Sequence, residues 1–232
     1  MHTGTWWYPM CITVGPGVTD GDTPAPEGYA QMVQMSEFQG NMTSYDMMLG
    51  GGASWYWTSF MHDKLTNDGP VAGLNEAPSW QEFVRNFYEQ DPFFSPSSFN
   101  MIQQVGREEY DGHISSLSGW SILLRDTKDV PVTEIYPESG VPMFFNSEAL
   151  FKDAPALNTA MLFQNWWLGE QPQKKYTRIE YCYSPHPNVE GIGATDLGKP
   201  LSEINATLPK WQKYAEMRPD LLSEIEQIKN SV

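Results

Sequence analysis

The stretch from Tyr136 to Gly169 constrains the fold of this chain more than any other part of the sequence. It opens with a turn, Pro137 to Gly140, in which proline fixes φ and glycine allows a positive φ. A short apolar strand, Val141 to Phe145, follows. A helix comes next, and its apolar residues recur every three or four positions; they are Ala160, Leu162, Phe163, Trp166 and Trp167. Asp153 or Asn158 can cap this helix and Gly169 can end it. A strand, turn and helix in this order predict an α/β protein.

The chain is long enough to fold into one full hydrophobic core or two small ones. It has 232 residues, and hydrophobic side chains make up 40% of them, with 13% aromatic. This composition favours a folded globule over a disordered chain. We find no internal repeat and no low-complexity segment.

The formal net charge of −15 argues against nucleic acid and anionic membranes as main partners, because both would be repelled. The plain interpretation of that charge is solubility. No run approaches the roughly 18 apolar residues of a membrane span. Residues 1–5 lack the features of a signal peptide, so an export signal, if there is one, is expected outside this sequence. Cys11 and Cys182 lie far apart, and the sequence leaves open whether they pair.

Further elements follow from local patterns along the chain. Thr5 to Val14 is rich in aromatic and β-branched residues and predicts a strand, with Pro9 indicating an edge or a bend. Other predicted strands are Asn41 to Tyr45, Phe93 to Phe94, Val130 to Tyr136 and Lys174 to Tyr183. Predicted helices are Trp55 to Leu65, Pro78 to Gln90, Phe99 to Val105 and Trp120 to Lys128. The tail from Leu208 to Asn230 is helical, and Pro219 is expected to break it into two pieces.

Several pieces of the sequence match, in order, a pattern known from one protein family. They are Pro137 to Pro142, Lys152 to Pro155, Asn158, Ala160, Leu162 to Phe163, Asn165 to Leu168 and Glu170 to Gln171. This series resembles the C-terminal lobe of the extracellular (periplasmic) solute-binding proteins of ABC transporters, in the branch of ferric-iron, polyamine and phosphonate binders. Most of the first lobe of such proteins has no counterpart here, so the resemblance describes a truncated member.

The resemblance implies an α/β lobe of the periplasmic-binding-protein type, with a mixed sheet flanked by helices and a helical C-terminal tail. It divides the chain into a crossover strand and loop (1–28), a solute-binding lobe (29–170) and a return segment with C-terminal helices (171–232). Ligands of such folds bind where strands end and helices begin. The candidate ligand-binding residues are therefore Gly50, Gly51, Gly52, Ala53, Ser54, Trp55, Ser97, Ser98, Ser116, Ser118 and Trp120.

These candidates suit a small polar or anionic solute. Three glycines before a helix leave backbone N–H groups free for a ligand oxygen, although a flexible turn would look the same. Met47 stands where the family usually has proline. Serine hydroxyls would hold polar groups, and Trp55 or Trp120 would stack on the ligand, although helix capping and core packing explain these residues equally well.

Ferric iron is a poor candidate ligand. Iron-binding relatives have two adjacent tyrosines where this chain has Ser118 to Trp120, and Fe(III) needs phenolate or carboxylate oxygens. The sequence also lacks zinc, phosphate-loop and dinucleotide motifs. We therefore expect no metal, no cofactor and no catalytic residue.

The resemblance implies a solute-binding component of ABC-type uptake, periplasmic or extracellular, with an ABC permease as its partner. The alternative is a hydrolase or esterase on the same scaffold, with Ser54 or Ser118 as nucleophile and a histidine as base. A truncated chain without present function is a third hypothesis. The surface left by the missing lobe, with Trp6, Trp7 and Tyr8, could support a homo-oligomer.

Overall fold

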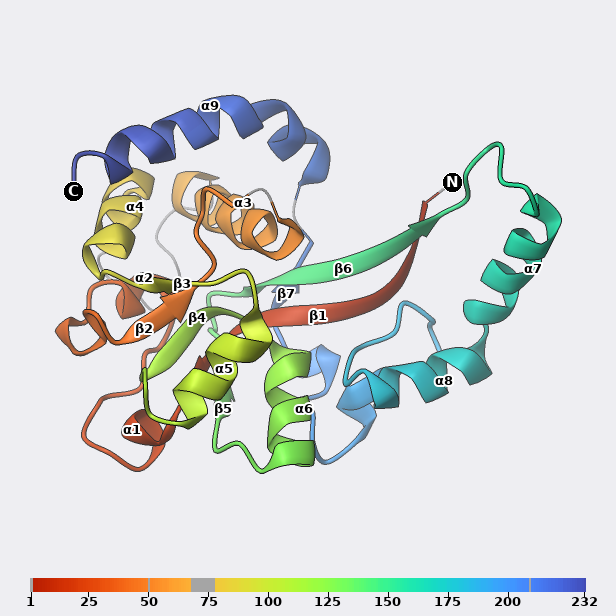
Figure 1. The fold of residues 1–232 in the computed structure, drawn as a ribbon, viewed down its shortest axis with the longest axis horizontal. Helices are drawn as coiled ribbons and strands as arrows, with labels where there is room; N and C mark the ends of the chain where they lie inside the picture. The colour runs from red at the N-terminus through yellow and green to blue at the C-terminus, as the bar shows by residue number, and fades with distance from the viewer. Residues whose placement is uncertain (1, 50, 68–77, 209) are drawn as a thin grey trace.

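One seven-stranded mixed sheet runs through the molecule (Figure 1). The structure is a computed structural model that describes residues 2–49, 51–67, 78–208 and 210–232. The strands are β1 (His2–Val14), β2 (Met42–Ser44), β3 (Phe93–Phe94), β4 (Gly112–Leu117), β5 (Thr133–Ile135), β6 (Val141–Ala149) and β7 (Ala206–Thr207).

Helices cover this sheet and connect its strands. They are α1 (Pro16–Thr19), α2 (Tyr29–Met32), α3 (Gly52–Asn67), α4 (Trp80–Glu89), α5 (Ser98–Gly106), α6 (Ser118–Lys128), α7 (Leu157–Trp167), α8 (Glu170–Ile179) and α9 (Trp211–Lys229). Short 3₁₀ turns lie at Ser36–Phe38, Gly191–Ala194 and Leu201–Glu203. The prediction of an α/β protein with a mixed sheet flanked by helices is confirmed. The described helices include none with the length and apolar character that a bilayer crossing requires.

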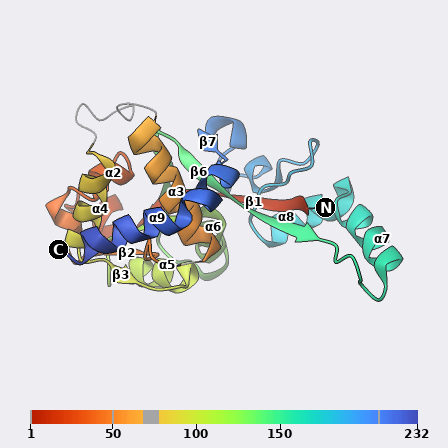
Figure 2. The ribbon, with the colours of Figure 1, turned by 90° about the horizontal axis from the view of Figure 1, so that it is seen from above.

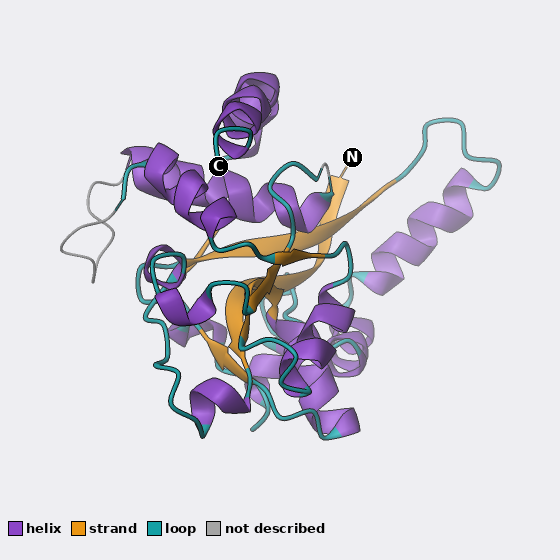
Figure 3. Cartoon of the chain, turned by 60° about the vertical axis from the view of Figure 1, so that its left-hand side comes forward, coloured by secondary structure: helices purple, strands orange, loops and turns teal. Residues whose placement is uncertain are grey.

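The strand order is β3-β2-β4-β1-β6-β7, with β5 also paired to β1. Strands β2, β3 and β4 are parallel to one another, whereas β1 runs antiparallel to β4, β5 and β6. Helices α3, α4 and α9 lie on one side of this sheet and α5 and α6 on the other (Figures 1 and 3). The large side chains buried between these layers include Trp57, Trp80, Phe83, Phe87, Met10 and Ile12.

Strand β1 changes its partners along its length. Its second half, Met10 to Val14, pairs with β4 and β5, and its first half, His2 to Pro9, pairs with β6. Pro9 pairs with Met143 of β6 and lies next to the point where the pairing changes, because the pairing with β4 begins only at Met10. Beyond this point β1 and β6 continue as a long ribbon away from the body and lead to α7 and α8 (Figures 1 and 2).

The turn before β6 forms as predicted. Gly140 has a φ of +108°, a conformation that other residues rarely adopt, and its N–H donates to the Pro137 carbonyl at 2.9 Å. The turn places Val141 beside Ala206 of β7.

Two predictions of secondary structure were wrong. Lys174 to Tyr183 was predicted as a strand, but Glu170–Ile179 is helix α8, whose face formed by Gln173 and Thr177 is buried. The i,i+4 pair of Glu170 and Lys174 supports the first turn of this helix. Helix α9 also continues through Pro219, because ion pairs hold both of its ends and its Leu221 and Ile225 are buried.

Other predictions needed smaller corrections. Ser116, a candidate ligand contact expected where a strand ends, lies within β4. Cys11 and Cys182 are both buried free thiols. Of the aromatic residues expected at an open surface, Tyr8 is buried and Trp6 packs against Tyr176 of α8 with ring centroids 5.1 Å apart. Trp7 is half-buried.

Candidate functional site

Three helices begin along one edge of the sheet. The parallel strands β2, β3 and β4 end there at Ser44, Phe94 and Leu117, and the chain then leads into α3, α5 and α6. Parallel strands have their carboxyl ends at the same edge, so the starts of these helices come together. We call this region the α3–α5–α6 edge. It collects the predicted ligand-binding residues from three separate parts of the sequence, except Gly50, which lies outside the described residues.

The first turn of α3 is the most open part of this edge. Gly51 and Gly52 are exposed and Ala53 is half-buried. Ser54 is buried, and its hydroxyl donates to the Asp46 carbonyl at 2.6 Å. Trp55 is buried as well, with the Arg218 guanidinium 5.1 Å from its ring centroid. Gly51 and Gly52 are thus the residues of this turn that a solute can reach.

The start of α5 is joined to the sheet by a serine and a histidine. Ser97 caps α5, and its hydroxyl accepts from the Asn100 N–H at 3.3 Å. The buried Ser98 hydroxyl lies 3.0 Å from His113 Nε2, and His113 Nδ1 lies 3.1 Å from the Thr43 carbonyl. A carbonyl can only accept, so Nδ1 carries the proton and Nε2 accepts from Ser98. Burial lowers the pKa of His113 to about 4, which keeps its ring neutral at pH 7.

The start of α6 is mostly covered. Ser118 is fully buried, and its hydroxyl lies beside that of Tyr136 without a well-formed hydrogen bond among the described residues. Gly119 is packed so closely that a Cβ would lie 2.3 Å from the Tyr8 ring. Trp120 is half-buried and is the part of this turn that reaches the surface.

A row of aromatic rings crosses the α3–α5–α6 edge. Trp120 packs against Phe99 of α5 at 5.9 Å between centroids and stacks on Tyr8 of β1 at 6.3 Å. Tyr8 stacks in turn on Phe144 of β6 at 6.5 Å, and Phe144 contacts Tyr56 of α3 at 4.8 Å. The edge thus has an apolar wall, formed by this row, in addition to the backbone N–H groups of Gly51 and Gly52. Of the rings in this row, the sequence predicted only Trp120 as a ligand contact, because β1 and β6 meet α6 through tertiary contacts alone.

Asp46 holds the loop between β2 and α3 in place. Its Oδ1 accepts from the Tyr88 hydroxyl at 2.7 Å and from the Met48 N–H at 3.0 Å. Its Oδ2 accepts from Lys229 Nζ, near the end of α9, at 2.8 Å. Burial alone would raise the pKa of Asp46, but these hydrogen bonds outweigh it and the pKa lies below its usual value. The carboxylate is thus ionised and already committed to structural contacts.

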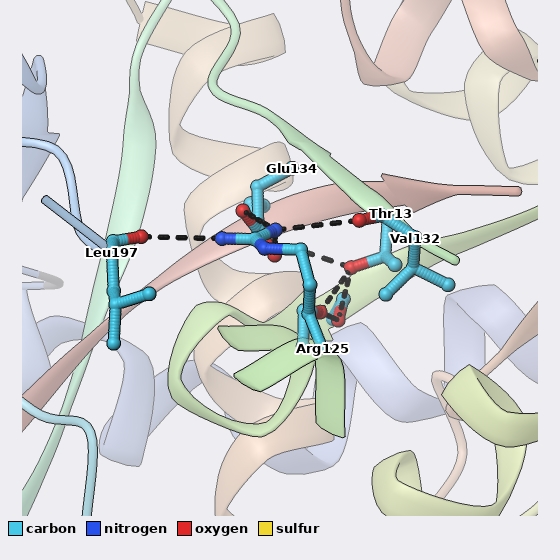
Figure 4. Close-up of polar contacts among 8 residues, drawn as sticks. Thr13, Arg125, Val132, Glu134 and Leu197 are labelled. Atoms are coloured by element: carbon cyan, nitrogen blue, oxygen red, sulfur yellow. Dashed lines mark hydrogen bonds and ion pairs between the residues drawn. The ribbon is translucent and has the colours of Figure 1, made fainter. Parts of the chain in front are cut away.

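A second polar group lies behind the edge, beneath α6. Figure 4 shows the Arg125 side chain between Glu134 and Leu197; its Nη1 lies 2.7 Å from both Glu134 oxygens, and its Nη2 donates to the Leu197 carbonyl at 3.1 Å. Burial raises the pKa of Glu134 even though Arg125 opposes this shift. The Thr13 hydroxyl nearby donates to Ser116 at 2.7 Å. Ser116 is therefore buried in this group and is not at the surface of the edge.

The geometry does not favour the hydrolase hypothesis. In the described part of the chain, the histidine-bonded serine is Ser98, whereas Ser54 donates to a backbone carbonyl and Ser118 is buried. The His62 ring lies 2.9 Å from the Tyr214 hydroxyl. Ser98 is itself only 3% exposed, so its contact with His113 is explained by the packing of α5 on β4.

Metal-binding side chains are also not gathered at this edge. Across the described residues, no group of three or more His, Cys, Asp or Glu side chains is placed to hold a metal ion. A separate hollow of about 560 Å³ opens between β1 and the loop that follows Tyr183. Its lining residues are Trp7, Ser184, Pro185, His186, Pro187, Asn188, Val189, Glu190 and Leu201.

The sequence matches no model of a known protein family and no curated protein. Solved structures do share its fold. AfuA of Actinobacillus pleuropneumoniae, a periplasmic binding protein with exogenous fructose-6-phosphate bound, superposes with a TM-score of 0.76 at 14% identity, over 98% of this chain and 68% of AfuA. An ABC-transporter substrate-binding protein of Agrobacterium tumefaciens gives 0.75 at 12% identity, over 98% and 67%. The ferric ion-binding protein A of Pasteurella haemolytica gives 0.75 at 13% identity, over 98% and 69%.

Proposed function

We propose that this chain, which has the fold of the periplasmic substrate-binding proteins of ABC transporters, binds a small polar or anionic solute and presents it to an ABC permease. AfuA is a periplasmic binding protein by name, and we extend a periplasmic or extracellular location to this chain. The observation that carries the proposal is the match of nearly the whole chain to these binding proteins.

The α3–α5–α6 edge supports the same function. Gly51 and Gly52 offer N–H groups in the first turn of a helix, where the helix dipole favours an anion or a ligand oxygen. Ser97 is half-buried at the start of α5 and adds a hydroxyl. Trp120 and Phe144 supply an apolar wall for the body of the solute. We assign direct contact to these residues.

The other candidates have a supporting role in this proposal. Ala53, Ser54 and Trp55 shape the first turn of α3, and Ser98, Ser116 and Ser118 hold the strands and helices beneath the edge. Their buried side chains would act through the position of the backbone. Gly50 stays a predicted contact outside the described residues.

An organic or oxyanionic solute fits this edge better than ferric iron does. Hard Fe(III) binds phenolate and carboxylate oxygens. This edge has Trp120 and buried serines at the positions where iron-binding relatives have two adjacent tyrosines. Asp46 is already held by Lys229 and Tyr88. The sugar phosphate in AfuA is an example of the solute class that we favour.

A thermal-shift panel tests the proposal. It should contain sugar phosphates, phosphonates, sulfonates, carboxylates, sugars, amino acids, polyamines and ferric iron. A ligand at a hundred times its dissociation constant stabilises the fold by about 2.7 kcal/mol, which is a shift of several degrees for a chain of this size. If no compound of the panel raises the Tm and calorimetry detects no binding, the proposal is refuted.

A matched pair of variants tests whether a ligand found in the panel binds at the α3–α5–α6 edge. A Cβ at Gly51 meets no atom within 4 Å, so a side chain there does not disturb the fold. Gly51→Asp adds a negative charge beside the expected anion, and Gly51→Asn adds the same volume without charge. An anion at this edge should bind at least about tenfold more weakly to Gly51→Asp than to Gly51→Asn. Equal affinities would place the ligand elsewhere, for example in the hollow beside Trp7.

A further inference from the structure

A small hollow lies away from the α3–α5–α6 edge, between the second half of α3 and the segment that leads into α9. Its volume is about 220 Å³. Phe60 and Lys64 line it from α3, and Leu208 and Lys210 line it from the segment before α9. Phe60 is eight residues beyond Gly52, which is about 12 Å along the helix. This hollow, which we call the α3–α9 hollow, is therefore distinct from the candidate solute site.

Part of the lining of the α3–α9 hollow is apolar. Phe60 is only 4% exposed, and the side chain of Leu208 is 57% exposed to water. An apolar group bound here would cover Leu208 and remove its surface from water, which favours binding. An engineered cavity of ~150 Å³ in another protein binds benzene. A hollow of about 220 Å³ thus has room for a ring of that size with a short substituent.

Lysine ammonium groups lie at this lining and next to it. Lys210 Nζ lies 2.7 Å from Asp63 Oδ2, and Lys213 Nζ lies 3.1 Å from Asp63 Oδ1. Lys64 Nζ lies 5.8 Å from the centroid of the Phe60 ring, so this ammonium group is held beside the apolar part of the lining. Ammonium groups are donors that form strong hydrogen bonds with anions. The hollow therefore combines an apolar wall with groups that recognise a negative charge.

The carboxylate of Asp63 does not cancel the charge of these lysines. Burial alone would raise the pKa of Asp63, but the hydrogen bonds from Lys210 and Lys213 outweigh it and hold the pKa below its usual value. The two segments that supply the lining, 59–64 and 207–214, contain three lysines and one aspartate. Their formal charge of +2 leaves −17 on the rest of the chain. This region is thus locally positive in an acidic protein, which favours an anionic ligand.

We propose that the α3–α9 hollow binds a small organic monocarboxylate with an apolar body. The carboxylate accepts hydrogen bonds from the ammonium groups of Lys64 and Lys210, and the apolar body lies against Phe60 and Leu208. A bare oxyanion leaves the apolar lining uncovered, and a neutral molecule of the same shape gains nothing from the positive charge. Because Lys210 is 57% exposed and the ligand is small, the dissociation constant is on the order of 1 mM.

A titration of the full chain, followed by the NMR chemical shifts of its backbone amides, tests this proposal. Phenylacetate and hexanoate have both a carboxylate and an apolar body, acetate lacks the apolar body, and phenylacetamide lacks the charge. Phenylacetate or hexanoate should bind with a dissociation constant of about 1 mM, and acetate and phenylacetamide at least about tenfold more weakly. The shifts should change at residues 59–64 and 210–214 and not at Gly51 and Gly52.

A matched pair of variants adds a charge at the lining without changing its size. Leu208→Glu and Leu208→Gln both replace an exposed side chain, so both should unfold at the temperature of the wild type. Phenylacetate should bind at least about tenfold more weakly to Leu208→Glu than to Leu208→Gln. Lys64→Met keeps the apolar stem and should weaken binding at least about threefold. The control Lys175→Met, at an exposed residue of α8, should bind like the wild type.

Several outcomes would overturn the proposal. They are no saturable binding of phenylacetate or hexanoate up to about 10 mM, equal binding of acetate or phenylacetamide, and equal affinities of the two Leu208 variants. If phenylacetate instead shifts Gly51 and Gly52 and binds Gly51→Asp more weakly than Gly51→Asn, it is a ligand of the α3–α5–α6 edge, and the proposal for the α3–α9 hollow is wrong. Binding at the hollow together with no response to the solute panel would refute the proposed uptake function and support this second site.

Discussion

The pair of Lys229 and Asp46 connects the last helix to the loop that leads into the candidate site. Lys229 Nζ lies 2.8 Å from Asp46 Oδ2 and also 4.9 Å from the centroid of the Tyr88 ring. The variant Lys229→Met keeps the apolar stem of the side chain and removes both interactions. We expect it to destabilise the fold and to loosen the loop between β2 and α3.

The magnitude follows from the exposure of the pair. Asp46 is 17% exposed and Lys229 37%, so the pair lies between a surface ion pair and a buried one. Surface pairs contribute about 0.2–1 kcal/mol, and breaking a buried pair costs about 3–5 kcal/mol. After a discount for the solvent around Lys229, and with a cation–π contact of about 0.5–1 kcal/mol, we expect a loss of ~2 kcal/mol. This corresponds to a decrease in Tm of about 4–8 °C.

The pH dependence has a defined sign. Asp46 has a folded-state pKa below its usual value, so the stability that it contributes is present above the unfolded-state pKa of about 3.9 and is lost as pH falls through the folded-state pKa. The difference in unfolding free energy between wild type and Lys229→Met is therefore complete at neutral pH. It decreases in strongly acidic solution, where Asp46 becomes protonated.

Urea unfolding of wild type, Lys229→Met, Asp46→Asn and the double variant measures the coupling directly. Lys175→Met is the matched control, because Lys175 is exposed on α8 and should change stability by less than about 0.5 kcal/mol. A coupling energy below about 0.5 kcal/mol would refute the reasoning, since independent sites already show deviations of that size. Hydrogen exchange of residues 46–49 should be faster in Lys229→Met than in the control.

Two further predictions concern buried titratable side chains. His113 has a pKa of about 4 in the folded protein and of 6.5 in the unfolded chain. Its contribution to the free energy of unfolding is therefore complete above pH 6.5, and about 3 kcal/mol of it is lost as pH falls to about 4. Urea unfolding across this pH range should show this loss in the wild type but not in His113→Asn. Arg125→Met leaves the Glu134 carboxylate, 8% exposed, without its ion-pair partner and should lower the free energy of unfolding in guanidinium by about 3–5 kcal/mol. Adding Glu134→Met should recover most of that loss. If it does not, the ion pair is not the cause of the loss.

Much of the fold could be predicted because its signals are local. The turn at Gly140, the strand after it and the apolar spacing of the helices depend on residues a few positions apart. Prediction failed for α8, where Lys174 to Tyr183 was predicted as a strand. The burial of Gln173 and Thr177 against the rest of the protein decided for a helix. It also failed at Pro219, because the helix-breaking tendency of proline is overcome by contacts at both ends of α9.

The candidate site was predictable only in part. The loops after β2, β3 and β4 could be named from the sequence, and the parallel pairing brings them to one edge. The sequence could not show which of their residues are open, and the structure leaves Gly51, Gly52 and Trp120 accessible while it buries Ser116 and Ser118.

Local composition alone determines that this chain forms an acidic α/β fold with glycine turns and amphipathic helices, because these properties act over one or two turns of backbone. Tertiary structure decides the rest. Tyr8 and Phe144 lie more than a hundred residues apart in sequence, and only the pairing of β1 with β6 makes them neighbours at the candidate site. The apolar spacing of α7 equally predicts a helix, but only the tertiary structure shows that Leu162 and Trp166 face water. The burial of a side chain depends on segments that are distant in sequence, so it cannot be predicted from a short segment alone.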